Sequence, residues 1–151
     1  NWEVLHKGTE HGLAIMYKKD VTLFGEVRTV GPLEMLSALL KIKQETILLC
    51  LVYRKPGPSG NFIRELVDEL SELPIERYRT LVIGDFNMDQ LLQENIQKIE
   101  FMNDMGFHQR SNYSTHILGG FLDLVFDNGN NDTVSWVPSP FSDHFVILIE
   151  L

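Results

Sequence analysis

The stretch that decides the fold is Leu81-Val82-Ile83-Gly84-Asp85-Phe86-Asn87, an apolar run that stops at Gly-Asp-Phe-Asn. A short apolar run bounded by a glycine predicts a buried strand that ends abruptly. Because side chains alternate along a strand, Asp85 and Asn87 are expected on one side of the chain and Phe86 on the other. A carboxylate and an amide displayed together at a strand end are typical of a site that handles a polarised or metal-bound water.

A second polar cluster, Ser142-Asp143-His144, opens the last apolar run of the sequence, residues 145–151. In layered α/β proteins, active sites collect at the mouths of buried strands. A lone histidine near a strand start is usually structural or solvated. A functional role for His144 is indicated only because it follows Ser142 and Asp143 at the start of an apolar run. Two polar clusters at strand ends in one short chain predict a single shared site.

Asp123 interrupts the apolar run of residues 121–126. A carboxylate in such a run is either exposed on an edge strand or buried at a high cost unless it has a partner. His144 supplies that partner, since a carboxylate that accepts an imidazole N–H fixes the tautomer and raises the basicity of the ring. The sequence therefore predicts an Asp123–His144 pair.

Tyr53 ends another apolar strand and is followed by Arg54 and Lys55. These residues are either an amphipathic strand end with two solvated cations, or a phenol and two cations that contact phosphate oxygens. Both readings stay open. His116 is likewise open between a structural role and a role in the site. The remaining histidines are expected to be solvated: His6, His11 and His108.

The bulk numbers describe one ordinary globular domain of 151 residues with a net charge of −8. That charge argues against a protein that binds nucleic acid through overall electrostatics, although divalent cations would neutralise the acids of the candidate site. The single cysteine, Cys50, excludes a disulfide framework and a zinc cluster, and is interpreted as a core residue in a reducing compartment. Neither a membrane-spanning run nor a signal peptide is predicted.

Hydrophobic periodicity predicts an α/β sandwich in which strands dominate and two helices interrupt them. Helices are expected at 62–73 and 91–105, the second with Leu92, Ile96, Ile99 and Met102 on its buried stripe. Residues 8–12 are expected to form a turn, and 21–30 stay ambiguous. Strands are expected at 2–5, 12–18, 34–42, 45–54, 79–84, 107–109, 121–127, 133–137 and 145–151.

The sequence contains no P-loop, no Rossmann glycine pattern and no Gly-x-Ser-x-Gly elbow, and its one cysteine is expected to be buried. Nucleophilic catalysis by a side chain is therefore not indicated. The Asp, Asn and His residues at strand ends suit metal-assisted attack of water on a phosphoryl centre.

Four segments in this order resemble the endonuclease/exonuclease/phosphatase family, which includes apurinic endonucleases and deoxyribonuclease I: residues 52–58, 83–87, 120–126 and 142–144. The Tyr-Arg-x-Pro-Gly-Pro and Leu-Asp-Leu-Val-Phe segments most resemble the endonuclease domain of LINE-type non-LTR retrotransposons. The resemblance implies a four-layered α/β sandwich of the deoxyribonuclease I type over residues 1–151. It also implies hydrolysis of DNA phosphodiester bonds with Mg²⁺ or Mn²⁺, and a reverse transcriptase in the parent polyprotein.

The resemblance implies roles for individual residues as well. Asp85 would activate the attacking water, Asn87 would hold the scissile phosphate, and Tyr53 would bind a phosphate oxygen. Asp123 would hydrogen-bond His144, which would stabilise charge that develops on the phosphate.

On the same analogy, Asp143 would serve the metal ion. Three further residues would contact nucleic acid: Arg54, Lys55 and Thr115.

The chain also departs from the family pattern. Family members begin with a strand–helix–strand unit that carries an asparagine and a metal-binding glutamate, and this sequence resembles the segment downstream of that glutamate. Because Mg²⁺ needs dedicated oxygen ligands, we expect the primary glutamate to lie upstream and this chain to be impaired as an enzyme.

Two alternatives follow from the same residues: a non-catalytic remnant or domesticated binding module of this fold, and a phosphatase or tyrosyl-DNA phosphodiesterase of the superfamily. A role on DNA implies access to the nucleus, although the sequence contains no basic import cluster.

Overall fold

The structure, a computed structural model, describes residues 1–7, 12–28, 33–57, 60–129 and 133–151. Most of the turn expected at 8–12 lies outside these residues. The described residues form strands β1 (Trp2–Lys7), β2 (Leu13–Lys18), β3 (Thr22–Arg28), β4 (Glu34–Ile42), β5 (Glu45–Tyr53), β6 (Arg79–Asp85), β7 (His108–Gln109), β8 (Asp123–Asp127), β9 (Thr133–Val137) and β10 (Val146–Glu150), and helices α1 (Phe62–Ser71) and α2 (Gln93–Asp104).

A six-stranded sheet in the order β3-β4-β5-β6-β8-β7 forms the centre of the molecule. Its β5 and β6 are parallel, and its other neighbouring pairs are antiparallel. A parallel pair needs a crossover connection, and α1 supplies it. The apolar run in β5 is buried on the helical face of the sheet through Leu48, Cys50 and Val52, and it is half-buried on the other face.

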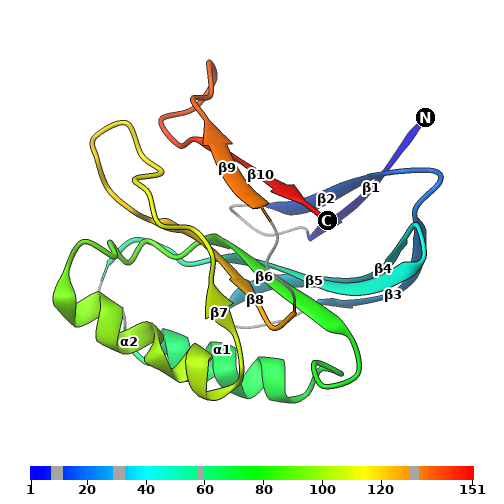
Figure 1. Ribbon diagram of the computed structural model, residues 1–151, viewed down its shortest axis with the longest axis horizontal. Helices are drawn as coiled ribbons and strands as arrows, with labels where there is room; N and C mark the ends of the chain where they lie inside the picture. Colours follow the sequence, from blue (N-terminus) through cyan, green and yellow to red (C-terminus); the bar gives the residue numbers. More distant parts are fainter. Residues whose placement is uncertain (8–11, 29–32, 58–59, 130–132) are drawn as a thin grey trace.

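Both helices cover one face of this sheet (Figure 1). The apolar stripe predicted for α1 is buried against it, with Leu66 and Leu70 fully enclosed. The stripe predicted for α2 is only partly buried: Met102 is enclosed, but Leu92 is 51% and Ile96 is 38% exposed. The second helix therefore packs mainly through its C-terminal half.

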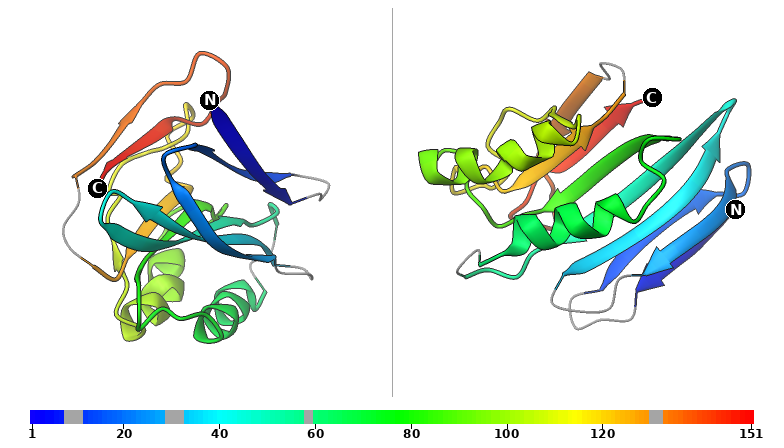
Figure 2. Two further views of the ribbon diagram at one scale, coloured as in Figure 1. Left: turned by 90° about the vertical axis from the view of Figure 1, so that its right-hand side faces the viewer. Right: turned by 90° about the horizontal axis from the view of Figure 1, so that it is seen from below.

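The opposite face of the sheet carries two small antiparallel sheets, β1–β2 and β9–β10 (Figures 1 and 2). Leu5, Leu13 and Ile15 of the first hairpin form a buried cluster with Leu36 and Leu40 of the central sheet. The predicted α/β sandwich is thus confirmed, with a helical layer, a central sheet and a second β layer in the described residues. Among those residues, no helix has the length and apolar character that crossing a membrane requires.

Two ambiguous or misplaced elements have physical explanations. Residues within 21–30 form β3, which pairs with β4 through a register shift between Leu23 and Gly25. The strand expected at 121–127 begins only at 123, because the carbonyls of Phe121 and Leu122 accept N–H groups of the loop that follows β6. That loop therefore takes the place of a strand neighbour at the site.

Gly84 is required by the close approach of β5. A Cβ atom at this position would lie 1.7 Å from the carbonyl oxygen of Val52. We expect Gly84→Ala to reduce the free energy of unfolding by about 3 kcal/mol, because the sheet must shift to admit the methyl group. Urea denaturation measures this loss. Gly25→Ala, which places its methyl group in open space, is the matched control, and equal losses in both variants would contradict the explanation.

Candidate active site

The sheet register brings three predicted site residues into one row. Tyr53 of β5 is paired with Asp85 of β6, and Asp85 is paired with Asp123 of β8. Paired residues project from the same face of a sheet, and Tyr53 packs against the cluster on the side of the small sheets. The row therefore opens toward the second β layer, from which His144 arrives.

The Gly-Asp-Phe-Asn turn has the alternation that the sequence predicts. Phe86 is fully buried on the helical side, with its ring centroid 5.8 Å from Phe62 and 5.6 Å from Phe126. Asn87 adopts a left-handed backbone conformation with φ of 46°, which asparagine tolerates better than most residues. Its backbone N–H donates to Asp85 Oδ1 at 2.9 Å, and its side-chain amide donates to Asp85 Oδ2 at 3.0 Å.

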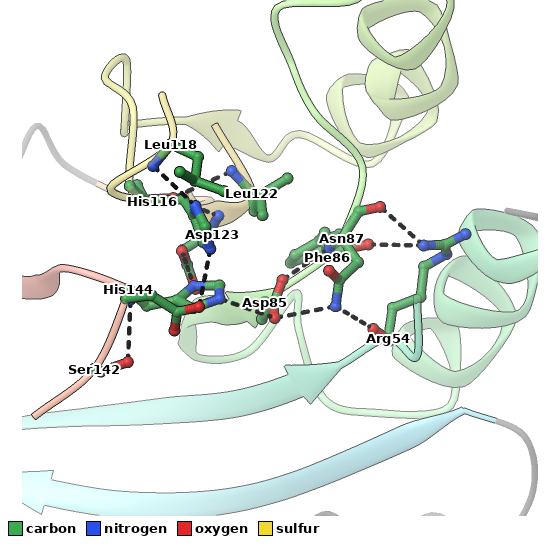
Figure 3. Close-up of polar contacts among 12 residues, drawn as sticks. Arg54, Asp85, Phe86, Asn87, His116, Leu118, Leu122, Asp123, Ser142 and His144 are labelled. Carbon is green, nitrogen blue, oxygen red and sulfur yellow. Dashed lines mark hydrogen bonds and ion pairs between the residues drawn. The ribbon is translucent and has the colours of Figure 1, made fainter. Parts of the chain in front are cut away.

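Arg54, which the resemblance assigns to nucleic-acid contact, lies inside the protein. Its side chain is buried and donates to the carbonyl oxygens of Phe86 (3.4 Å), Asn87 (3.0 Å) and Gly57. In return, the Asn87 amide donates to the Arg54 carbonyl at 2.7 Å (Figure 3). The guanidinium thus fixes the turn after β6, and this placement does not support the expected contact with nucleic acid. Lys55, the next residue, is exposed.

The predicted Asp123–His144 hydrogen bond is present, at 2.8 Å between Nδ1 and Oδ2. The other ring nitrogen of His144, Nε2, lies 3.9 Å from Asp85 Oδ2. The ligand atoms of all three residues lie within 4.8 Å of one another (Figure 3). An imidazole held by one carboxylate therefore has its other ring nitrogen directly beside a second carboxylate.

Thr115 hydrogen-bonds the backbone segments that carry Asp123 and His144. Its hydroxyl accepts the backbone N–H groups of Leu122 (3.1 Å) and Asp123 (2.9 Å), and its carbonyl accepts the N–H of Phe145 at 2.8 Å. The residue is only 2% exposed, so it does not line a DNA-facing groove as the resemblance implied. It instead joins the backbone segments that carry Asp123 and His144, a role that no local sequence pattern indicates.

His116 and Asp143 form a second histidine–carboxylate contact beside the first. His116 Nε2 lies 3.2 Å from Asp143 Oδ2, and the His116 ring meets the His144 ring edge-on at 5.0 Å. The Asp143 side chain is 61% exposed. The structure thus places His116, which the sequence left open, at the rim of the site.

The site perturbs its own titratable groups. Burial raises the pKa of Asp85, although the hydrogen bonds from Asn87 oppose this, and the nearby charge of Asp123 adds to the increase. Burial works against protonation of His144, but the hydrogen bond and charge of Asp123 outweigh it and raise the pKa of the ring. Burial also raises the pKa of the Tyr53 phenol, with help from the charges of Asp85 and Glu34. A carboxylate with a raised pKa is a stronger base, which suits general-base chemistry.

We expect Asp123→Asn to lower the pKa of His144 in the metal-free protein, because it removes a charge from the Nδ1 side of the ring. In the wild type the folded-state pKa exceeds the ordinary value of 6.5. Protonated His144 therefore stabilises the fold at low pH, and this contribution is lost as pH rises through the folded-state pKa. An NMR titration of the ring in EDTA measures the change. Asp104→Asn, an exposed site on α2, is the control, and an unchanged pKa in Asp123→Asn would refute the pairing.

The oxygen donors suit a hard divalent cation. Mg²⁺ is commonly held by one or two carboxylates and completes its shell with water and substrate phosphate. Asp143 offers an exposed carboxylate beside His116 and His144, and Asp85 and Asp123 form a second group with His144. Neither metal-compatible group found in the described residues includes a glutamate. The residues present therefore fit a cation with a largely aqueous shell.

Comparison with known proteins gives the fold. No protein-family model matches the chain, and no curated protein does. Among solved structures, one similar protein is described as a functionally unknown conserved protein from Enterococcus faecalis V583, with a TM-score of 0.77, 17% identity, and coverage of 99% of this chain and 76% of that one. Another is an endonuclease/exonuclease/phosphatase family protein from Leptotrichia buccalis C-1013-b (TM-score 0.69, 16% identity, coverage 100% and 72%). The chain has the endonuclease/exonuclease/phosphatase fold.

The same endonuclease/exonuclease/phosphatase fold occurs in the mannosyl-6-phosphatase Bt3783 of Bacteroides thetaiotaomicron VPI-5482, with a TM-score of 0.72, 14% identity, and coverage of 99% of this chain and 76% of that one. At these identities the likeness establishes the architecture. Function has to be argued from the residues at the strand ends.

Proposed function

We propose that the chain hydrolyses phosphodiester bonds in DNA with the help of a divalent cation, as an endonuclease of the retrotransposon type. The observation that carries the proposal is the Asp123–His144–Asp85 array at the ends of β8 and β6, with Asn87 bound to Asp85. On this fold, that set of groups suits attack of water on a phosphoryl centre.

Each residue of the array has a distinct task in this proposal. Asp85, a carboxylate with a raised pKa, orients the attacking water and takes up its proton. His144 directs Nε2 at the same space and, when protonated, stabilises negative charge that develops on a phosphate oxygen. When bound, Mg²⁺ would be held by Asp143 and would neutralise phosphate charge.

Substrate binding uses the groups around this centre. Both side-chain N–H groups of Asn87 donate within the protein, to Asp85 and to the Arg54 carbonyl, so a bound phosphate would compete for one of them. Lys55 is exposed and follows Tyr53, the phenol in the row with Asp85. A recess of about 390 Å³ beside Asn87 is lined in part by Lys98, with Glu94 as the one acidic residue among its lining. These groups suit an anionic polymer better than a small neutral substrate.

A phosphatase is the second candidate, since the mannosyl-6-phosphatase of B. thetaiotaomicron shares the fold. The resemblance of residues 52–58 and 120–126 to retrotransposon endonucleases favours DNA, with a reverse transcriptase elsewhere in the same polyprotein. On that reading the protein acts where it has access to chromosomal DNA.

A substrate panel separates these functions. We expect the protein, at millimolar Mg²⁺, to nick supercoiled plasmid slowly, because neither metal-compatible group in the described residues includes a glutamate. It should leave p-nitrophenyl phosphate intact, and EDTA should abolish the nicking. Faster hydrolysis of the monoester would favour the phosphatase. Retention of the plasmid in a mobility-shift assay without any cleavage would instead indicate a binding module.

A further inference from the structure

His116 is attached to the site at several points, yet none of the tasks above uses it. Its backbone forms an isolated β-bridge with His144, and its ring meets the His144 ring edge-on. The side chain is only 15% exposed. A histidine enclosed in this way has a definite orientation, so its two nitrogens can be assigned from their partners.

The hydrogen bonds of His116 define its tautomer. The backbone N–H of Leu118 donates to Nδ1 at 3.1 Å, so Nδ1 has to present its lone pair. The proton of the neutral ring is then on Nε2, which lies 3.2 Å from Asp143 Oδ2. His116 therefore donates a hydrogen bond to the carboxylate of Asp143.

We propose that His116 is a positioning residue that holds the Asp143 carboxylate beside His144 for the cation. The proposal rests on the function proposed above, in which Asp143 serves the metal ion. The neighbouring backbone contributes as well, since the N–H of Ile117 donates to the Asp143 carbonyl at 2.9 Å. Consecutive residues thus fix the main chain and the side chain of Asp143.

The role is one of orientation more than of stability. The Asp143 side chain is 61% exposed, and exposed pairs of this kind contribute little to the free energy of folding. An unsupported carboxylate at the rim would rotate freely, whereas metal ligands depend on a partner that fixes their orientation.

The same three residues could instead be read as a site for a softer cation, because the ligand atoms of His116, Asp143 and His144 lie within 4.8 Å of one another. Coordination through His116 Nε2 would move the ring proton to Nδ1. That proton would then face the N–H of Leu118, donor against donor. The observed hydrogen bond therefore favours His116 as a donor to Asp143 over His116 as a ligand.

Two substitutions divide the functions of the ring. His116→Phe keeps an aromatic ring against His144 but removes the donor, whereas His116→Gln keeps a side-chain N–H that can reach Asp143 but removes the ring. We expect His116→Phe to weaken Mn²⁺ binding, measured by water-proton relaxation, about tenfold. The half-saturating Mg²⁺ concentration for nicking should rise by a similar factor, and His116→Gln should restore both values toward those of the wild type.

Equal losses in the two variants would show that only ring packing matters and would overturn the proposal, as would wild-type Mn²⁺ binding in His116→Phe. Long-range ¹H–¹⁵N spectra of the metal-free wild type should show the Nε2–H tautomer of His116. Observation of the Nδ1–H tautomer in that sample would also overturn the proposal, as would coordination of added Zn²⁺ by Nε2. A wild type without nuclease activity counts against the proposed function alone, because Mn²⁺ binding and the tautomer still decide the role of His116.

Discussion

Asp85→Asn is expected to lower the rate of plasmid nicking about a thousandfold. The substitution keeps the size of the side chain but removes the carboxylate. The raised pKa of Asp85 makes this carboxylate a suitable base to accept a proton from water. General-base catalysis contributes on the order of a hundredfold to ten-thousandfold. The measurement is the single-turnover rate of conversion of supercoiled to nicked plasmid at saturating Mg²⁺.

Asp104→Asn is the matched control, because it makes the same chemical change at an exposed position on α2. Thermal unfolding of each variant checks that the fold is intact. A folded Asp85→Asn protein that nicks within a few-fold of the wild type would remove Asp85 from the proposed mechanism.

The second large effect is expected at His144. His144→Ala should reduce nicking by about two to three orders of magnitude, since it removes the group that stabilises charge on the phosphate. In the wild type, the Asp123 carboxylate hydrogen-bonds the His144 ring at 2.8 Å, so Asp123→Ala should act through the same ring. The double variant should therefore lose little more activity than His144→Ala alone, as expected for residues that work as a unit.

Four proteins measured in parallel, namely the wild type, the two single variants and the double variant, test this coupling. His108→Ala supplies the control, because His108 is an exposed histidine on the edge strand β7. Losses from His144→Ala and Asp123→Ala that simply multiply in the double variant would mean that the two residues act independently.

Much of the fold and part of the site could be predicted from local patterns. Alternation at the end of β6 predicts that Phe86 enters the core on the side opposite Asp85. Asn87 lies beyond the strand in a left-handed conformation, and its hydrogen bonds hold it beside Asp85. The Asp123–His144 pair was predictable because an acid within an apolar strand needs a partner. Asp127, at the other end of β8, shows the limit of that reasoning. It is fully buried, whereas the Asp123 side chain is 15% exposed, and Arg79 neutralises Asp127 at 2.8 Å.

The remaining features depend on tertiary contacts. From the sequence, Arg54 is either a solvated cation at a strand end or a phosphate contact, yet three backbone carbonyl groups surround its guanidinium. Thr115 reads as a small surface residue, although its hydroxyl is buried beneath the start of β8. The donor–acceptor pattern around His116 depends on a loop conformation that no residue pattern predicts. At these positions, polar side chains near the site hydrogen-bond backbone groups and so fix the segments that carry the site residues.

We propose above that the Asp123–His144–Asp85 array performs cation-dependent hydrolysis of DNA. The most direct test of this proposal is the nicking rate of the wild type at millimolar Mg²⁺ beside that of the Asp85→Asn, His144→Ala double variant. We expect nicking by the wild type alone, stopped by EDTA and restored by added Mg²⁺. Equal nicking by the folded double variant, or nicking that persists in EDTA, would contradict it.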